Sequence, residues 1–130
     1  MKKVLLLILI LLSLNIESKP LKINGGTFDL DIYVYTGTDT TYLKKEIGNL
    51  VNIELTGNDF EARGLTLYNY SYPIVMWFPE YPKDISLLNH ELLHVVVAIM
   101  QWANIPLTNE TEEIYAYELQ YLTKQLEHVR

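Results

Sequence analysis

The sequence predicts an α+β fold in which a small mixed β-sheet packs against helices. Three observations support this fold class. Short runs of β-branched and aromatic residues are bounded by glycine or proline, the last third of the chain holds two stretches with apolar residues at helical spacing, and 130 residues suffice for one compact domain. The expected order is a strand, a helix, two or three further strands and then two helices.

The first predicted elements are a strand over residues 28–35 and the helix that follows it. The strand region is rich in β-branched and aromatic residues and lies between glycines. Thr38 or Asp39 can cap the helix, whose apolar residues recur at helical spacing up to Leu50 and which ends near Gly48 and Asn49. Residues 51–55 have the composition of a short strand.

The middle of the chain predicts a β-hairpin. Residues 64–69 alternate between apolar and polar side chains, and residues 74–78 form a second apolar run directly after Pro73. We expect these two strands to pair. If the strand over 65–69 lies at the edge of the sheet, an extended peptide can add to it as a further strand.

Two helices are expected in the last third of the chain. Asp84 or Ser86 can cap a long, mostly buried helix that runs to Trp102 and stops before Pro106. The last helix begins near residue 108 or 109 and runs to about residue 127. Its first turns carry three glutamates, which interact favourably with the helix dipole.

The N-terminus differs in composition from the rest of the chain. Lys2 and Lys3 precede an unbroken apolar run over residues 4–12, the pattern of a secretory signal. We expect residues 1–18 to be a signal peptide or an uncleaved anchor. An anchor would hold the chain in a membrane through residues 4–14. Residues 19–130 are expected to fold as an exported domain, periplasmic or secreted. The alternative is a buried N-terminal strand or helix.

Charge and cysteine content narrow the function classes. The net charge of −6 disfavours a nucleic-acid binder, which needs clustered positive charge. The chain has no cysteine, so thiolate catalysis, Cys-ligated zinc and iron–sulfur clusters are excluded. Any metal must therefore be bound by histidine, carboxylate or carbonyl ligands.

One motif indicates a chemical activity. It is the run His90-Glu91-Leu92-Leu93-His94 in the long predicted helix. A four-residue step places both imidazoles on one face about one turn apart, where they can reach the same zinc ion. Glu91 lies roughly 100° around the helix from His90, in the position of a general base that contacts the water on the ion. A third protein ligand is expected, with the fourth position left to water.

These residues resemble the zincin metallopeptidases, and more narrowly the gluzincin branch, whose third ligand is a downstream glutamate. Eighteen residues separate His94 from Glu113, and residues 113–117 look like the glutamate helix of that branch. The resemblance covers about residues 62–122 and extends to the short zincins of phages and bacteria. It implies a minimal zincin-like domain in which His90, His94 and Glu113 bind Zn²⁺ and Glu91 is the base. The chain departs from larger gluzincins because no second domain follows to form the far wall of a cleft.

Several neighbouring residues are weaker candidates. Glu112 is the second choice for the third ligand after Glu113, and Glu110 lies nearest the helix cap. Tyr117 can donate a hydrogen bond to a developing oxyanion, although a packing role is the more frequent one for tyrosine. Asn89 can support a ligand or face solvent, and His128 can interact with the dipole of the last helix.

The function that follows is a zinc-dependent hydrolase with a peptide or protein substrate. A second hypothesis is a non-catalytic zinc-binding or interaction module with the same fold. A third is a membrane-tethered interaction domain in which the two histidines are core residues. Neither the oligomeric state nor the cleavage specificity follows from the sequence.

Overall fold

The computed structural model describes residues 19–69 and 72–127, so the predicted leader and His128 lie outside the described residues. The described residues form a four-stranded sheet, three α-helices and two short 3₁₀ turns, which confirms the predicted α+β class. The strands are β1 (Leu21–Asn24), β2 (Asp31–Thr36), β3 (Leu65–Asn69) and β4 (Tyr72–Phe78). The helices are α2 (Thr40–Val51), α3 (Ile85–Trp102) and α4 (Glu112–Glu127), and the 3₁₀ turns are η1 (Gly26–Phe28) and η2 (Gly57–Glu61).

The sheet is mixed, with strand order β1-β2-β4-β3. β1 pairs with β2 and β3 pairs with β4 in the antiparallel sense, whereas β2 and β4 are parallel. The β3–β4 pairing confirms the predicted hairpin. Since β3 has only β4 as a neighbour, it is an edge strand.

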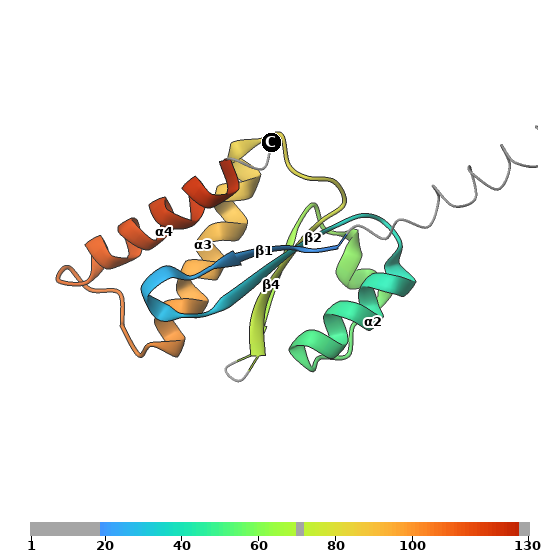
Figure 1. Cartoon of the computed structure of the whole chain (residues 1–130), viewed down its shortest axis with the longest axis horizontal. Coiled ribbons are helices and arrows are strands. Elements are labelled where there is room, and N and C mark those ends of the chain that lie inside the picture. The colour runs from blue at the N-terminus through green and yellow to red at the C-terminus, as the bar shows by residue number, and fades with distance from the viewer. Residues whose placement is uncertain (1–18, 70–71, 128–130) are drawn as a thin grey trace, which may run out of the picture.

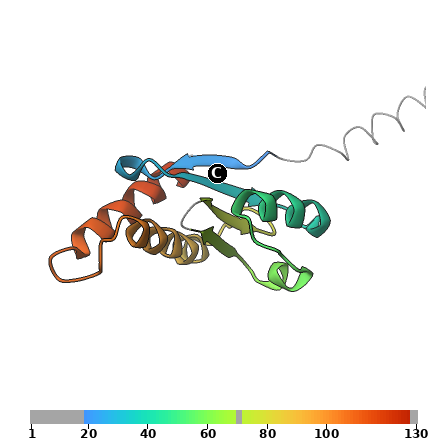
Figure 2. The same cartoon turned by 90° about the horizontal axis from the view of Figure 1, so that it is seen from below.

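Helices cover both faces of the sheet. In Figures 1 and 2, α2 lies on one side of the sheet, and α3 and α4 lie together on the other. In β4, Met76 and Phe78 pack with α3 and α4, while Val75 and Trp77 pack with α2. The continuous apolar run in β4 follows from this arrangement, because a strand covered on both faces has no solvent-facing side.

The chain between β1 and β2 differs from the sequence prediction. The strand expected over residues 28–35 begins only at Asp31, and Phe28 belongs to η1. Gly26 and Asp29 have positive φ angles of 63° and 49°, which interrupt an extended chain. The preceding strand β1 was not predicted, because four residues give little periodicity to detect.

The short strand predicted over residues 51–55 was wrong. Val51 is the last residue of α2, and Asn52 ends the helix in the left-handed conformation with a φ of 52°. The next residue turns back so closely that the Ile53 backbone N–H donates to the Gly48 carbonyl at 3.1 Å. A Cβ at position 48 would lie 2.9 Å from the Ile53 carbonyl oxygen, so this turn requires glycine.

Aspartates cap the first two helices. Asp39 accepts a hydrogen bond from the Tyr42 backbone N–H, and Asp84 accepts one from the Ser86 backbone N–H. α4 begins a few residues later than expected because residues 108–111 form a turn, in which Glu112 donates to the Thr108 carbonyl at 2.9 Å.

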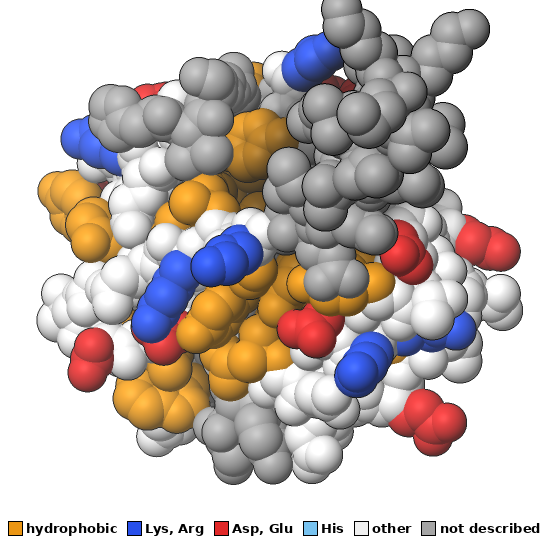
Figure 3. Space-filling model, turned by 45° about the vertical axis from the view of Figure 1, so that its right-hand side comes forward, with side chains coloured by type: hydrophobic (Ala, Val, Ile, Leu, Met, Phe, Trp, Pro, Cys, Tyr) orange, Lys and Arg blue, Asp and Glu red, His pale blue; other side chains and the backbone are white. Residues whose placement is uncertain are grey.

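α3 is the central helix of the domain. Among the described residues it is the one helix with the length and hydropathy of a membrane span. Its burial against the sheet and α4 explains the same composition, because eight of its 18 residues are buried. The face of the molecule drawn in Figure 3 has acidic and basic side chains interspersed with hydrophobic ones, so neither sign of charge dominates it.

Candidate metal centre

His90 and His94 lie next to each other on the exposed face of α3. Their Nε2 atoms are 3.3 Å apart, and the ring centroids are separated by 5.0 Å with an interplanar angle of 79°. The predicted step of one helical turn therefore brings the two imidazoles together. Both side chains are exposed, which is contrary to the hypothesis that they are core residues.

Glu91 points toward β3. The residue is 5% exposed, and its Oε2 accepts a hydrogen bond of 2.6 Å from the Thr66 hydroxyl. The same hydroxyl lies 3.3 Å from the Glu91 backbone carbonyl oxygen. Thr66 therefore links the edge strand β3 to both the side chain and the backbone of Glu91 in α3. The carboxylate orientation is thus set by a partner 25 residues earlier in the chain.

Gly64 allows Glu91 to pack this closely. A Cβ on Gly64 would lie 3.1 Å from Glu91 Cγ and 3.0 Å from Cε1 of the buried Phe78 ring. Both distances are shorter than ordinary van der Waals contact. The glycine before β3 therefore leaves the space that the Glu91 side chain occupies.

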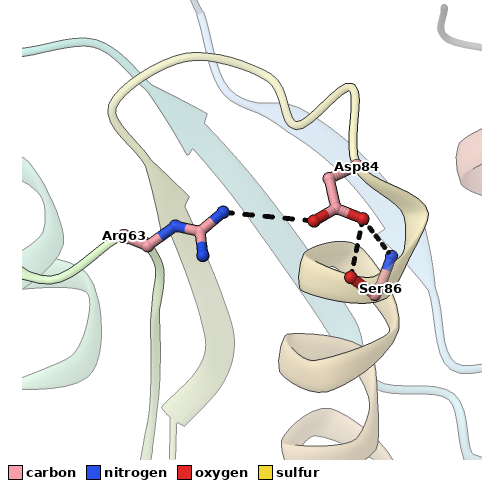
Figure 4. A network of polar contacts seen from close by, with 3 residues as sticks. All are labelled: Arg63, Asp84 and Ser86. Atoms are coloured by element: carbon pink, nitrogen blue, oxygen red, sulfur yellow. Dashed lines mark hydrogen bonds and ion pairs between the residues drawn. The ribbon is translucent and has the colours of Figure 1, made fainter.

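His90 and Glu91 line the same open hollow, which has a volume of about 570 Å³. Arg63 and residues at the start of α3, Asp84 and Ser86 among them, also line it. Figure 4 shows Arg63 directed toward Asp84, whose carboxylate contacts Ser86. Asp84 accepts hydrogen bonds from the Ser86 hydroxyl at 2.6 Å and the Ser86 backbone N–H at 2.9 Å, and lies 4.0 Å from Arg63 Nη2. These Ser86 hydrogen bonds, with a smaller contribution from Arg63, lower the pKa of Asp84.

The structure does not bring the predicted third ligand to the histidine pair. Glu113 and its alternative Glu112 are exposed in the first turn of α4. α4 runs antiparallel to α3 (Figure 1), and its first turns lie beside the far end of α3, where the Tyr115 hydroxyl donates to the Ile105 carbonyl at 2.8 Å. Over residues 19–69 and 72–127, no group of three or more His, Asp or Glu side chains is placed to hold a metal ion.

The remaining candidates lie elsewhere on the surface. Tyr117 is 67% exposed and lines a different hollow from the one that His90 and Glu91 share. Asn89 is exposed on α3. Glu110 belongs to the turn before α4, where a hydrogen bond with the Thr108 side chain lowers the pKa of its carboxyl.

Sequence reasoning missed three residues that shape the site or its surroundings: Gly64, Thr66 and Glu118. Thr66 and Gly64 gave no signal, because their roles depend on contact between β3 and α3. Glu118 did give one: it lies four residues before Leu122 and eight before Leu126, on the apolar stripe of α4. A charged residue on such a stripe predicts a buried carboxyl.

Glu118 is 7% exposed, and burial raises the pKa of its carboxyl to about 7. Since this carboxyl titrates near 4.5 when unfolded, the folded state binds the proton more tightly. Its contribution to stability is complete below pH 4.5 and is lost as the pH rises through 7. We expect Glu118→Gln to raise the free energy of unfolding at pH 8 by about 1 to 3 kcal/mol relative to wild type, and by much less at pH 4.5.

Urea unfolding followed by circular dichroism at the two pH values measures this difference. Tyr117 and Tyr121 line the same hollow as Glu118. Glu127→Gln, an exposed carboxylate on the same helix, is the matched control and should show no such pH-dependent gain. Equal effects of the two substitutions at both pH values would contradict the assignment.

The chain was also compared with known proteins. No family model matches it, and neither the curated proteins nor the solved structures include one with significant similarity to it.

Proposed function

We propose that this chain is a zinc-dependent hydrolase that acts on peptides, with His90 and His94 holding the ion and Glu91 serving as general base. The observation that carries the proposal is the 3.3 Å distance between the two histidine Nε2 atoms. Two nitrogen ligands about 2.0–2.1 Å from one tetrahedral zinc ion lie roughly 3.3 Å apart. The histidine pair thus has the spacing of two ligands in a tetrahedral zinc site.

Zinc, when bound, lowers the pKa of a coordinated water to about 7 and polarises a substrate carbonyl. The chain must then provide a base within reach of that water. Glu91 fits this role because it lies beside His90 in the same hollow, and its carboxylate is held by the Thr66 hydroxyl at 2.6 Å. A base held in one orientation loses little entropy when the substrate binds.

A peptide is the substrate class that the surroundings of the pair favour. β3 is the edge strand of the sheet, and it lies directly beside α3 through the bond between Thr66 and Glu91. An extended peptide can pair with the free backbone groups of an edge strand. Such a peptide would run past the hollow that His90 and Glu91 line.

The third ligand is a separate step of the proposal. Glu113, and after it Glu112, is the ligand that the resemblance to gluzincins implies, but both lie exposed at the start of α4. For Glu113 to reach the ion, the first turn of α4 has to move toward the histidine face. Zinc affinity of the glutamate variants therefore tests this step separately from the histidine pair.

A non-catalytic zinc-binding or interaction module is the second candidate function. It is favoured by the contacts of Glu91, whose buried carboxylate joins α3 to β3 through Thr66. A side chain with that structural role need not act as a base. In this case zinc binds the histidine pair, and no peptide is hydrolysed.

Zinc titration tests the site. One zinc per wild-type chain is expected by calorimetry and elemental analysis, and the double variant His90→Gln, His94→Gln should lose it. The exposed neighbour Asn89, changed to Gln, is the matched control and should keep it. Stoichiometric zinc in the double variant would refute the site. Glu113→Gln and Glu112→Gln then identify the third ligand, which is the one whose loss weakens zinc binding.

Export of the chain is a separate proposal, based only on the composition of residues 1–18. The domain would then act in the periplasm or outside the cell, or remain held to a membrane by an uncleaved leader. The N-terminal sequence of the mature protein tests this point.

A further inference from the structure

A second hollow, of about 680 Å³, lies between η1 and α4. Its walls are the turn Gly26–Phe28 and four residues of α4, namely Ile114, Tyr117, Glu118 and Tyr121. None of these residues lines the hollow at the histidine pair. The two hollows therefore share no lining residue.

Glu118 is an unusual residue for such a wall. It is 7% exposed, and its Oε1 is fully buried and has no hydrogen-bond partner. Among the residues that the structure describes, this is the one buried side-chain nitrogen or oxygen in that condition. A buried carboxylate without a partner is costly, and a donor or a positive charge that reaches it recovers that cost.

The rim of the hollow is aromatic and open to solvent. Tyr117 is 67% exposed, Tyr121 43% and Ile114 40%, and the half-buried Phe28 lies on the opposite wall. Exposed apolar side chains gathered around one hollow are typical of a binding surface. Aromatic rings also attract cations to their faces.

The walls are held in place by polar contacts at one end of the hollow. Gln125 of α4 donates to the Asn24 carbonyl at 2.8 Å and accepts from the Asn24 backbone N–H at 3.2 Å. The Tyr121 ring lies so close to Gly26 that a Cβ there would be 2.9 Å from Tyr121 Cε1. The hollow therefore exists before any ligand arrives, which reduces the entropic cost of binding.

We propose that this hollow binds a small organic cation, an ammonium group carried on an aromatic or aliphatic body. The ammonium donates a hydrogen bond to the Glu118 carboxylate, and the apolar body packs against Tyr117, Tyr121 and Phe28. A charge-assisted bond to a buried carboxylate is stronger than one between neutral groups. No covalent step is involved.

Other ligand classes fit the hollow less well. A neutral apolar molecule would leave the Glu118 carboxylate without a partner, and an anion would be repelled by it. A metal ion needs several oxygen ligands, but no group of three acidic or histidine side chains in the described parts of the chain can hold one. The combination of one carboxylate and several rings selects a monovalent organic cation.

The probe is 2-phenylethylammonium, and 2-phenylethanol is its neutral counterpart of nearly equal shape. Both are titrated at pH 8, where the carboxylate is ionised, into the full chain labelled for two-dimensional NMR. We expect millimolar binding of the ammonium, at least tenfold tighter than that of the alcohol, with shifts at residues of η1 and α4. Equal affinity of the two probes, or no shifts in this region, would overturn the proposal.

Glu118→Gln keeps the shape of the side chain and removes its charge. It should weaken ammonium binding by at least about tenfold and leave the weak binding of the alcohol unchanged. The exposed carboxylate of Glu127 is the control, because Glu127→Gln removes one negative charge, as Glu118→Gln does, without touching the hollow. If both variants weaken binding to the same extent, general attraction to an acidic protein explains it and the site is refuted.

Tyr117→Ser provides a second variant that does not depend on the behaviour of the buried carboxyl. Tyr117 is largely exposed, so its loss should not affect folding. We expect weaker binding of both probes, since the ring contributes to the apolar wall. Unchanged binding of both would show that the probes do not occupy this hollow.

Discussion

Glu91→Gln is expected to lower peptide hydrolysis by about 10²- to 10⁴-fold while one zinc ion stays bound. The amide has nearly the same shape as the carboxylate, and its oxygen can still accept the hydrogen bond from the Thr66 hydroxyl. The contact between α3 and β3 is therefore kept, and only the ability to take a proton is removed. Turnover of a peptide library, measured beside zinc content and thermal stability, checks this result.

The control is Glu61→Gln, an exposed carboxylate at the end of η2. It should leave turnover, zinc content and stability unchanged. Glu91→Gln that retains full activity would exclude Glu91 as the base. A wild-type protein that binds zinc but hydrolyses no member of the library would favour the non-catalytic module instead.

Gly64→Ala is expected to lower turnover by about 10- to 100-fold, because the new methyl group pushes on Glu91, the proposed base. It would lie 3.1 Å from Glu91 Cγ and 3.0 Å from Phe78 Cε1. Phe78 is fully buried and cannot move far, so the Glu91 side chain has to shift. Overpacking of this kind also costs about 1 to 3 kcal/mol of stability.

Gly57→Ala is the matched control, because a Cβ at that position meets nothing within 4 Å. Turnover, zinc affinity and urea unfolding should be compared for the two variants. Zinc affinity should stay near wild type in both, since the atoms nearest a Cβ at position 64 belong to Phe78 and Glu91, not to a histidine, and a Cβ at position 57 meets nothing within 4 Å. A Gly64→Ala protein with wild-type turnover would show that the position of Glu91 is not important for the reaction.

The class of the fold and most of its elements could be predicted from the sequence. The alternation in residues 64–69 and the apolar run in residues 74–78 were sufficient for the β3–β4 hairpin, and the caps at Asp39 and Asp84 marked two helix starts. The errors fell where a few residues decide the conformation. Asp29 and Asn52 adopt positive φ angles that no periodic pattern reports.

The candidate site, like the fold, could be predicted from the sequence only in part. The distance between the two imidazoles follows from a four-residue step on any α-helix, so the pair was predictable before its surroundings were known. Glu113 was expected beside it from the resemblance to gluzincins, but the position of the first turn of α4 relative to the histidines depends on how the two helices pack. α3 continues to Trp102, so α4 begins beside the far end of the histidine helix.

Local sequence thus accounts for most of the secondary structure and for the spacing of the histidine pair, because each depends on residues a few positions apart. Folding of the whole chain decides which carboxyl groups are buried and what they contact. Thr66 meets Glu91 across 25 residues, and Glu118 lines one hollow together with the turn Gly26–Phe28, about 90 positions earlier in the chain. The free energies of these groups depend on desolvation and on partners that only the packed structure brings within reach.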